Sequence, residues 1–130
     1  MKMLKENPRS LMSTLWIFVL LNMIFRDLHE LAKKSYIENI LSSNINEELL
    51  LIFGFILEIP ILMVVLSRIL DGKLNKWANL FAVSVMLIGF STTLSTADMD
   101  DIFFMAMETL ALLAITIIAW TLPKTRTQSI

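Results

Sequence analysis

The sequence predicts an all-α polytopic membrane protein, folded as an antiparallel bundle of four transmembrane helices. Hydrophobic residues make up 56% of the 130-residue chain and charged residues 18%, against roughly 45–50% and about 25% in ordinary soluble domains. Four long apolar stretches alternate with short polar segments. We therefore expect residues 1–130 to form a single membrane domain. Its helices should lie at about 11–31, 49–70, 74–97 and 102–122.

Basic residues precede the first helix, 11–31, as they do in a signal peptide. The charged segment Arg26–Glu30 follows its apolar run in place of the small residues that cleavage requires, so we expect an uncleaved helix. The second helix, 49–70, reaches about 33 Å, enough for a hydrocarbon core of about 30 Å. Pro60 lies inside it and predicts a kink rather than a break, because neighbouring helices can satisfy the freed carbonyl.

Polar residues interrupt the third and fourth helices at only a few places. The third, 74–97, carries a hydroxyl cluster near its end, and the fourth, 102–122, holds one charge, Glu108. The turns at 71–73 and 97–101 are tight, so adjacent helices must run antiparallel. The connection after the first helix is longer. Its apolar residues recur at helical spacing, which predicts a short helix lying on the membrane surface.

Composition excludes several classes of function. The net charge of −1 provides no basic stripe for nucleic acid. Cysteine is absent, which excludes disulfides and thiolate metal sites. The single histidine, His29, cannot form a multi-histidine cluster and is expected to be solvated near the membrane interface. We therefore expect no metal site and no cofactor. The expected partners are the lipid bilayer and either further copies of the chain or a larger membrane complex.

The distribution of basic residues predicts the orientation. Lysine and arginine prefer the cytoplasmic side, and a cytoplasmic N-terminus places eight of the eleven basic residues there. These are Lys2, Lys5, Arg9, Arg68, Lys73, Lys76, Lys124 and Arg126. Most acidic residues then fall in the outer connections, and Trp77 and Trp120 lie near the inner interface, where indole is favoured. We expect a multi-pass protein of the cell membrane with both termini in the cytoplasm.

Two acidic residues, Glu58 and Glu108, lie within the predicted spans. A charged side chain there costs about 2.5–3.5 kcal/mol, so we expect both to face the bundle interior. The predicted orientation places both roughly 9–14 Å below the outer boundary, level with Asn22 and with the hydroxyls of the third helix. We therefore expect Glu58 and Glu108 to face each other in a shared ligand-binding site. Its expected members are Glu58, Glu108, Asn22, Asp27 and Thr92.

Carboxylates brought together in a medium of low dielectric need a cation, a proton or a basic partner. The nearest candidate counter-charge is Arg26, which lies one helical turn from Asn22 on the same face. Such a site suits a cation, protons, or a basic or hydroxylated organic ligand. The alternative is structural: the two acids are protonated or hydrogen-bonded to Asn22 and the threonines, and they only fix helix packing.

Several segments taken together resemble a known family. They are Leu15-Trp16-Ile17-Phe18 leading to Asn22 and Asp27, Leu57-Glu58-Ile59-Pro60 leading to Arg68, Lys76-Trp77-Ala78-Asn79, and Glu108. They resemble a family of small bacterial four-helix membrane proteins catalogued as a domain of unknown function, over most of the chain. The resemblance implies the fold and these polar positions, but no activity. It also draws attention to Arg68, Trp77 and Asn79, which would meet at the cytoplasmic face, either as a polar site or as a basic anchor with an interfacial tryptophan.

Three functions are compatible with these features. The first is binding or transport of an ion or small solute at the intramembrane carboxylate site. The second is an enzyme acting on an apolar substrate, with Glu58 or Glu108 as general acid or base; no nucleophile–base pair supports it, and no catalytic residue can be named. The third is an accessory membrane subunit without chemistry, whose polar groups recognise a partner helix.

Overall fold

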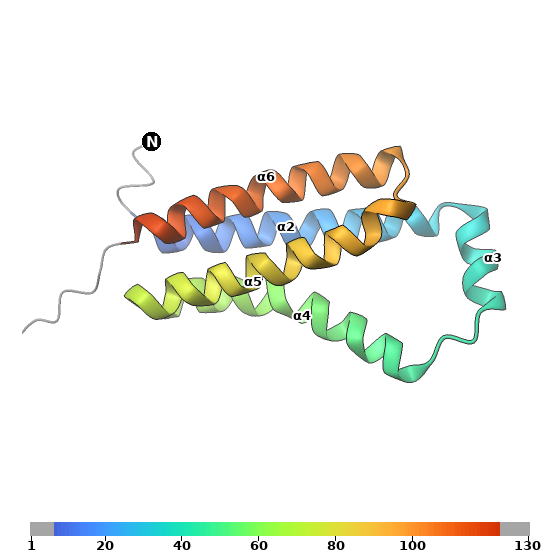
Figure 1. Ribbon diagram of the computed structural model, residues 1–130, viewed down its shortest axis with the longest axis horizontal. Helices are drawn as coiled ribbons and strands as arrows, with labels where there is room; N and C mark the ends of the chain where they lie inside the picture. Colours follow the sequence, from blue (N-terminus) through green and yellow to red (C-terminus); the bar gives the residue numbers. More distant parts are fainter. Residues whose placement is uncertain (1–6, 123–130) are drawn as a thin grey trace, which may run out of the picture.

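The computed structural model describes residues 7–122, which fold almost entirely into helices (Figure 1). The α-helices are α2 (Pro8–Leu31), α3 (Lys34–Ser42), α4 (Glu47–Ile69), α5 (Gly72–Thr93) and α6 (Met99–Thr121), with a short 3₁₀ helix η1 (Leu94–Thr96) between the last two. α2, α4, α5 with η1, and α6 are each long and apolar enough to cross a membrane. The all-α class is confirmed. The described chain contains five α-helices, of which α3 is the short helix expected in the first connection.

Capping residues explain why two helices begin earlier than their apolar runs. The side chain of Asn7 accepts a hydrogen bond from the backbone N–H of Ser10 at 3.2 Å, and Pro8 occupies the first helical position of α2. Both features favour a helix start. At the start of α6, the carboxylate of Asp101 accepts a hydrogen bond from the backbone N–H of Asp98 at 3.3 Å. Hydrophobic periodicity alone places both starts about one turn too late.

The four long helices form a ring. α2 packs against α4 and α6, and α5 packs against the same two helices. The centre is filled by apolar side chains from all four, which include Trp16, Val19, Met63, Met86, Leu112 and Ile115. α4 and α6 therefore occupy opposite corners of the ring, with α2 and α5 between them.

α4 bends along its length, and its first half leans away from the other long helices (Figure 1). A bend is expected for a helix with an internal proline, and Pro60 lies inside α4 with its side chain buried. Residues 47–55 of the first half are all exposed, whereas Met63 and Ser67 of the second half are buried. The bend thus separates a packed half of α4 from one that has little contact with the bundle.

The opposite end of the bundle is held by close contacts. Gly72 begins α5 with a φ of 47°, a left-handed conformation that glycine adopts without a steric penalty. Arg9 forms an ion pair with Asp71 in the turn before it. The ammonium of Lys76 lies 3.4 Å from the centre of the Trp120 ring, which joins α5 to α6. These contacts bring the start of α2, the α4–α5 turn and the end of α6 together.

Candidate functional site

An ion pair joins α2 to α6 inside the bundle. Nη1 of Arg26 lies 3.3 Å from Oε2 of Glu108. The Glu108 side chain is fully buried, whereas that of Arg26 is 16% exposed. The guanidinium carbon of Arg26 also lies 5.8 Å from the centre of the Phe90 ring on α5. A buried carboxylate needs such a partner, because an unpaired charge in an apolar medium is costly.

The hydrogen bonding of this pair is incomplete. Within residues 7–122, Oε1 of Glu108 is the one buried side-chain polar atom that has no hydrogen-bond partner. The guanidinium of Arg26 makes a single side-chain hydrogen bond in the same range, although it carries several N–H donors. Both members of the pair thus keep capacity for another hydrogen-bonding group.

Arg26 also lines a pocket of about 530 Å³ between α2, α4 and α5. The polar residues of its lining are Arg26, Asp27, Tyr36, Thr92 and Thr93. The hydroxyls of Thr92 and Thr93 donate to the carbonyl of Gly89, at 2.7 Å and 3.2 Å, and both oxygens can still accept. The remaining lining is apolar and comes mainly from α4 and α5. The pocket therefore combines the guanidinium of Arg26, the carboxylate of Asp27 and three hydroxyls with an apolar wall.

The structure brings together some of the expected site residues and not others. Asp27 and Thr92 both line the pocket, and Glu108 lies behind Arg26. Asn22 does not line it; its side-chain amide donates to the carbonyl of Phe18, one turn earlier in the same helix, at 2.9 Å. Within residues 7–122, the Asn22 side chain therefore makes its hydrogen bond inside its own helix and not to Glu58 or Glu108.

The expected pairing of Glu58 with Glu108 across the bundle is wrong. Glu58 is exposed, whereas Glu108 is completely buried. The two residues belong to α4 and α6, which occupy opposite corners of the ring and pack on α2 and α5. Equal depth does not determine the direction in which a side chain leaves its helix, and Glu58 points away from the interior.

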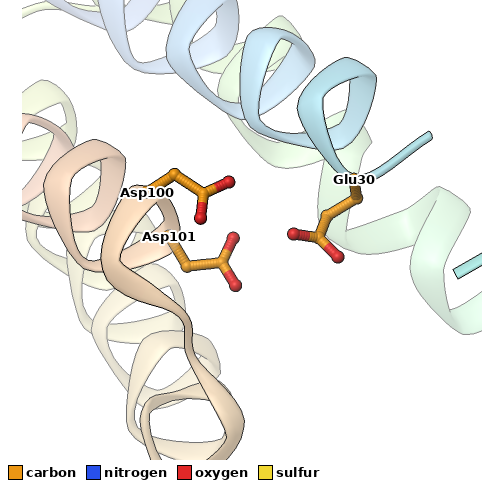
Figure 2. Close-up of side chains that lie close together, drawn as sticks. All are labelled: Glu30, Asp100 and Asp101. Atoms are coloured by element: carbon orange, nitrogen blue, oxygen red, sulfur yellow. The ribbon is translucent and has the colours of Figure 1, made fainter. Parts of the chain in front are cut away.

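A second charged group lies where α2 ends and α6 begins. Figure 2 shows Glu30 facing Asp100 and Asp101, and carboxylate oxygens of the three lie within 4.8 Å of one another. That spacing is compatible with a metal ion. However, Nζ of Lys33 already lies 2.6 Å from Glu30 and 3.2 Å from Asp100, so a metal ion would have to compete with this ammonium.

Lys33 also reaches Asp98, at 2.9 Å. Its hydrogen bonds to Glu30 and Asp98 raise the pKa of the Lys33 ammonium. Neighbouring His29 is exposed, and its ring contacts Phe104 edge-on with 5.7 Å between the centroids. We interpret the group around Lys33 as a link between α2, the following connection and the start of α6.

A buried polar network, which the sequence did not predict, lies at the other end of the bundle and includes Asn79. Nε1 of Trp16 donates to Oδ1 of Asn79 at 2.7 Å, and the Ser67 hydroxyl donates to the same oxygen at 3.2 Å. The Asn79 amide in turn donates to Oδ1 of Asn75 at 2.7 Å. All four side chains are buried. Asn75 lies one turn before Asn79 on α5, and that i, i+4 spacing was the available signal.

The residues expected at this end divide into different environments. Nε of Arg68 donates to the Ser13 hydroxyl at 3.0 Å, which itself donates to the carbonyl of Val64 at 2.7 Å. Asn79 belongs to the buried network, and Trp77 is 62% exposed. Arg68, Trp77 and Asn79 therefore do not form one site. Because every buried amide group of the network has a partner, we assign it a structural role.

Four helices that are long and apolar enough to cross a membrane define a small polytopic protein of the integral-membrane class. The chain belongs to the family of unknown function DUF6326, which matches residues 1–129. This confirms the resemblance to a domain of unknown function. Comparison with characterised proteins and with solved structures returned no match.

Proposed function

We propose that this membrane protein binds an ion or small solute at a polar site formed by Arg26, Asp27 and Glu108. The observation that carries the proposal is the incompletely hydrogen-bonded Arg26–Glu108 pair beside a pocket of about 530 Å³. The pocket lies within the size range of small-molecule sites. Glu108 does not line the pocket itself and belongs to the proposed site as the ion-pair partner of Arg26, without Glu58.

The contrast with the other end of the bundle supports this proposal. The network of Trp16 and Asn79 is buried to the same degree as Glu108, and its amide groups are all hydrogen-bonded. A polar group kept only for helix packing is expected to be satisfied in this way. An ion pair inside a membrane is costly and marks functional sites, and the unused capacity beside a pocket indicates a place for a ligand.

The site has groups for two kinds of ligand chemistry. The free donors of Arg26 can hold an anionic or hydroxylated group. The carboxylate of Asp27 lines the pocket and can accept a hydrogen bond from a basic group. Transport of the bound solute is the extended form of the proposal. It would need a homo-oligomer or larger complex, because one chain of this size is small for alternating access.

Ligand-induced stabilisation tests the proposal. The full chain, purified in dodecyl maltoside, would be titrated with sodium, phosphate, choline, ethanolamine and phosphoethanolamine while its thermal midpoint is followed. A ligand at 100 times its Kd stabilises by about 2.7 kcal/mol, which shifts the midpoint by several degrees. Arg26→Gln and Asp27→Asn should remove the shift, whereas Glu58→Gln should retain it. A shift that is equal in all variants, or no shift with any probe, would contradict the proposal.

Glu58 supports a second candidate, an accessory subunit that binds a partner helix. Glu58 is exposed on α4, and the first half of that helix presents Leu50, Phe53 and Phe55 to the outside. A carboxylate facing lipid costs about 2.5–3.5 kcal/mol, so a covering partner would stabilise this surface. A stoichiometric protein that co-purifies with the wild type and is lost in Glu58→Leu would favour this function. If the wild type and Glu58→Leu both purify as monomers without a partner, the accessory-subunit function is excluded.

A further inference from the structure

We infer that the ligand is a zwitterionic amphiphile with its anionic group on Arg26, its ammonium on Asp27 and its hydrocarbon chain along the apolar wall. This inference rests on the proposed function and names its substrate class. Three independent features of the pocket carry it: the order of polar and apolar residues along it, the pairing of opposite charges, and its exposed edges.

The lining of the pocket changes from polar to apolar along the bundle. Arg26 and Asp27 lie in the last turns of α2, and Thr92 and Thr93 end α5. Tyr36 of α3 lies at the same end. The lining residues nearer the middle of their helices are apolar, and they include Met23, Ile56, Leu57, Val85 and Met86. A ligand with a polar head and an apolar tail matches this order.

The polar end presents one positive and one negative side chain to the same space. Arg26 and Asp27 are adjacent in α2, and both line the pocket. Arg26 keeps free N–H donors beside its ion pair with Glu108, so it can hold an anionic group. Asp27 would repel a simple anion, and Arg26 would repel a simple cation. A headgroup that carries both a phosphate and an ammonium satisfies each residue at once. Arginine suits the phosphate, because its planar donors bind phosphate oxygens in pairs.

The edges of the pocket are exposed on the apolar flank of the bundle. Phe53 of α4 and Ile88 of α5 both line the pocket, and they are 54% and 65% exposed. The bent first half of α4 leans away from α5 on this side (Figure 1). A hydrocarbon chain could therefore enter from the bilayer without leaving an apolar medium. A water-soluble solute would gain nothing from this wall.

Two glycines provide a matched pair of variants. A Cβ built at Gly89 meets no atom within 4 Å, and Gly89 lines the pocket. Gly54 is equally open, but it lies on the exposed face of α4 and is absent from the lining. Replacing either by leucine raises helix propensity by a similar amount. Gly89→Leu therefore fills the pocket, and Gly54→Leu is its control for helix stability and added apolar surface.

The test is binding of a single-chain phosphoethanolamine lysolipid to the full chain in dodecyl maltoside, measured by native mass spectrometry and thermal midpoint. We expect its Kd to be at least about tenfold lower than that of phosphoethanolamine, a difference of about 1.4 kcal/mol. Gly89→Leu, Arg26→Gln and Asp27→Asn should each raise the Kd about tenfold or more. Gly54→Leu should leave it unchanged. A lysolipid with a phosphoglycerol headgroup, which is anionic, should bind more weakly than the zwitterionic lysolipid. Asp27→Asn should reduce the difference in Kd between the two.

The possible results separate the two proposals. Equal binding of phosphoethanolamine with and without its chain would overturn the amphiphile and leave the proposed site intact. Equal Kd values for the anionic and zwitterionic lysolipids would overturn the inference that the headgroup is zwitterionic. The same affinity in Gly89→Leu, Arg26→Gln and the wild type would place the lysolipid elsewhere and overturn the inference. If none of the small probes named above binds either, the proposed function falls with it.

Discussion

The indole Nε1 of Trp16 and the side-chain oxygen of Asn79 lie 2.7 Å apart in the interior, joining α2 directly to α5 across the ring of helices. Ser67 of α4 donates to the same oxygen at 3.2 Å. One amide thus connects three helices. A buried oxygen that accepts from two neighbouring helices determines their relative rotation, which apolar contacts alone leave adjustable.

Loss of this amide should be more costly than loss of the indole. Trp16→Phe removes one donor but leaves Asn79 bonded to Ser67, which should cost about 1–2 kcal/mol. Asn79→Ala leaves the Trp16 N–H and the Asn75 oxygen without partners, at about 1–3 kcal/mol each. Unfolding in mixed micelles, followed by circular dichroism, measures the difference. Ser84→Ala, at an exposed hydroxyl bonded within its own helix, is the control. Equal losses in the two network variants would contradict the prediction.

The Arg26–Glu108 pair should show strong energetic coupling. Arg26→Met leaves a fully buried carboxylate without its partner, and breaking a buried pair in this way costs about 3–5 kcal/mol. Glu108→Gln should lower the free energy of unfolding by less, because the guanidinium left without its partner is partly exposed and lines the pocket, where it can be solvated. The double variant should be more stable than Arg26→Met alone. Unfolding free energies of the four proteins complete the cycle. Additive losses would show that the two side chains do not interact.

The four apolar spans and the helix between the first two were predictable because length and hydropathy require only composition along the chain. The rotation of each helix was not. α4 is apolar on nearly every side, so its pattern identifies no interior face. Glu58 was expected to face the interior because a charge facing lipid is costly, but it is exposed. Glu108 was assigned correctly to the interior, where Arg26 meets it.

The polar interior was also only partly predictable. Ser67 and Asn75 are short polar residues near helix ends, a position where such residues are ordinarily solvated or act as caps. Their burial depends on the neighbouring helix: Ser67 donates to Asn79 of α5, and Asn75 donates to the carbonyl of Ser67 in α4. Thr92 was expected in the site from its depth, whereas Asp27 was expected above that level, near the outer end of the first helix; both line the pocket.

Two glycine substitutions should change stability in opposite directions. Gly72→Ala places a Cβ at a φ of 47°, and a left-handed conformation costs other residues about 1–2 kcal/mol. Gly54→Ala lies inside α4 with open space around its Cβ, and it should gain about 0.8–1 kcal/mol of helix propensity. Thermal midpoints of the two variants test this. A stable Gly72→Ala would show that the α4–α5 turn can adopt another geometry.

The link made by Lys33 should withstand alkaline pH. Because the folded-state pKa of Lys33 is raised, its stabilising contribution is complete below the ordinary value of 10.5 and is lost only as pH rises through the higher folded value. The difference in thermal midpoint between wild type and Lys33→Met should therefore stay constant between about pH 6 and pH 9. Salt should reduce it, because the pair is near the surface. A difference that disappears by pH 9 would contradict the link.

Both termini are predicted to be cytoplasmic, because eight of the eleven basic residues then lie on that side. Topology reporters fused after Ile130 and within residues 42–46 should report opposite sides of the membrane. The first should be active only as a cytoplasmic reporter. The reverse result would invert the orientation and place the Arg26 end of the pocket on the cytoplasmic side.

The bend of α4 has a consequence for hydrogen exchange, because the two halves of the helix differ in burial. The second half shares buried contacts with Trp16 and Asn79 through Ser67 and Met63, so its backbone amides should open only when the whole bundle does. Residues 47–55 of the first half are all exposed, so in detergent their amides are expected to exchange without unfolding of the bundle. Pro60 should therefore separate slowly exchanging amides in the second half of α4 from rapidly exchanging amides in the first half.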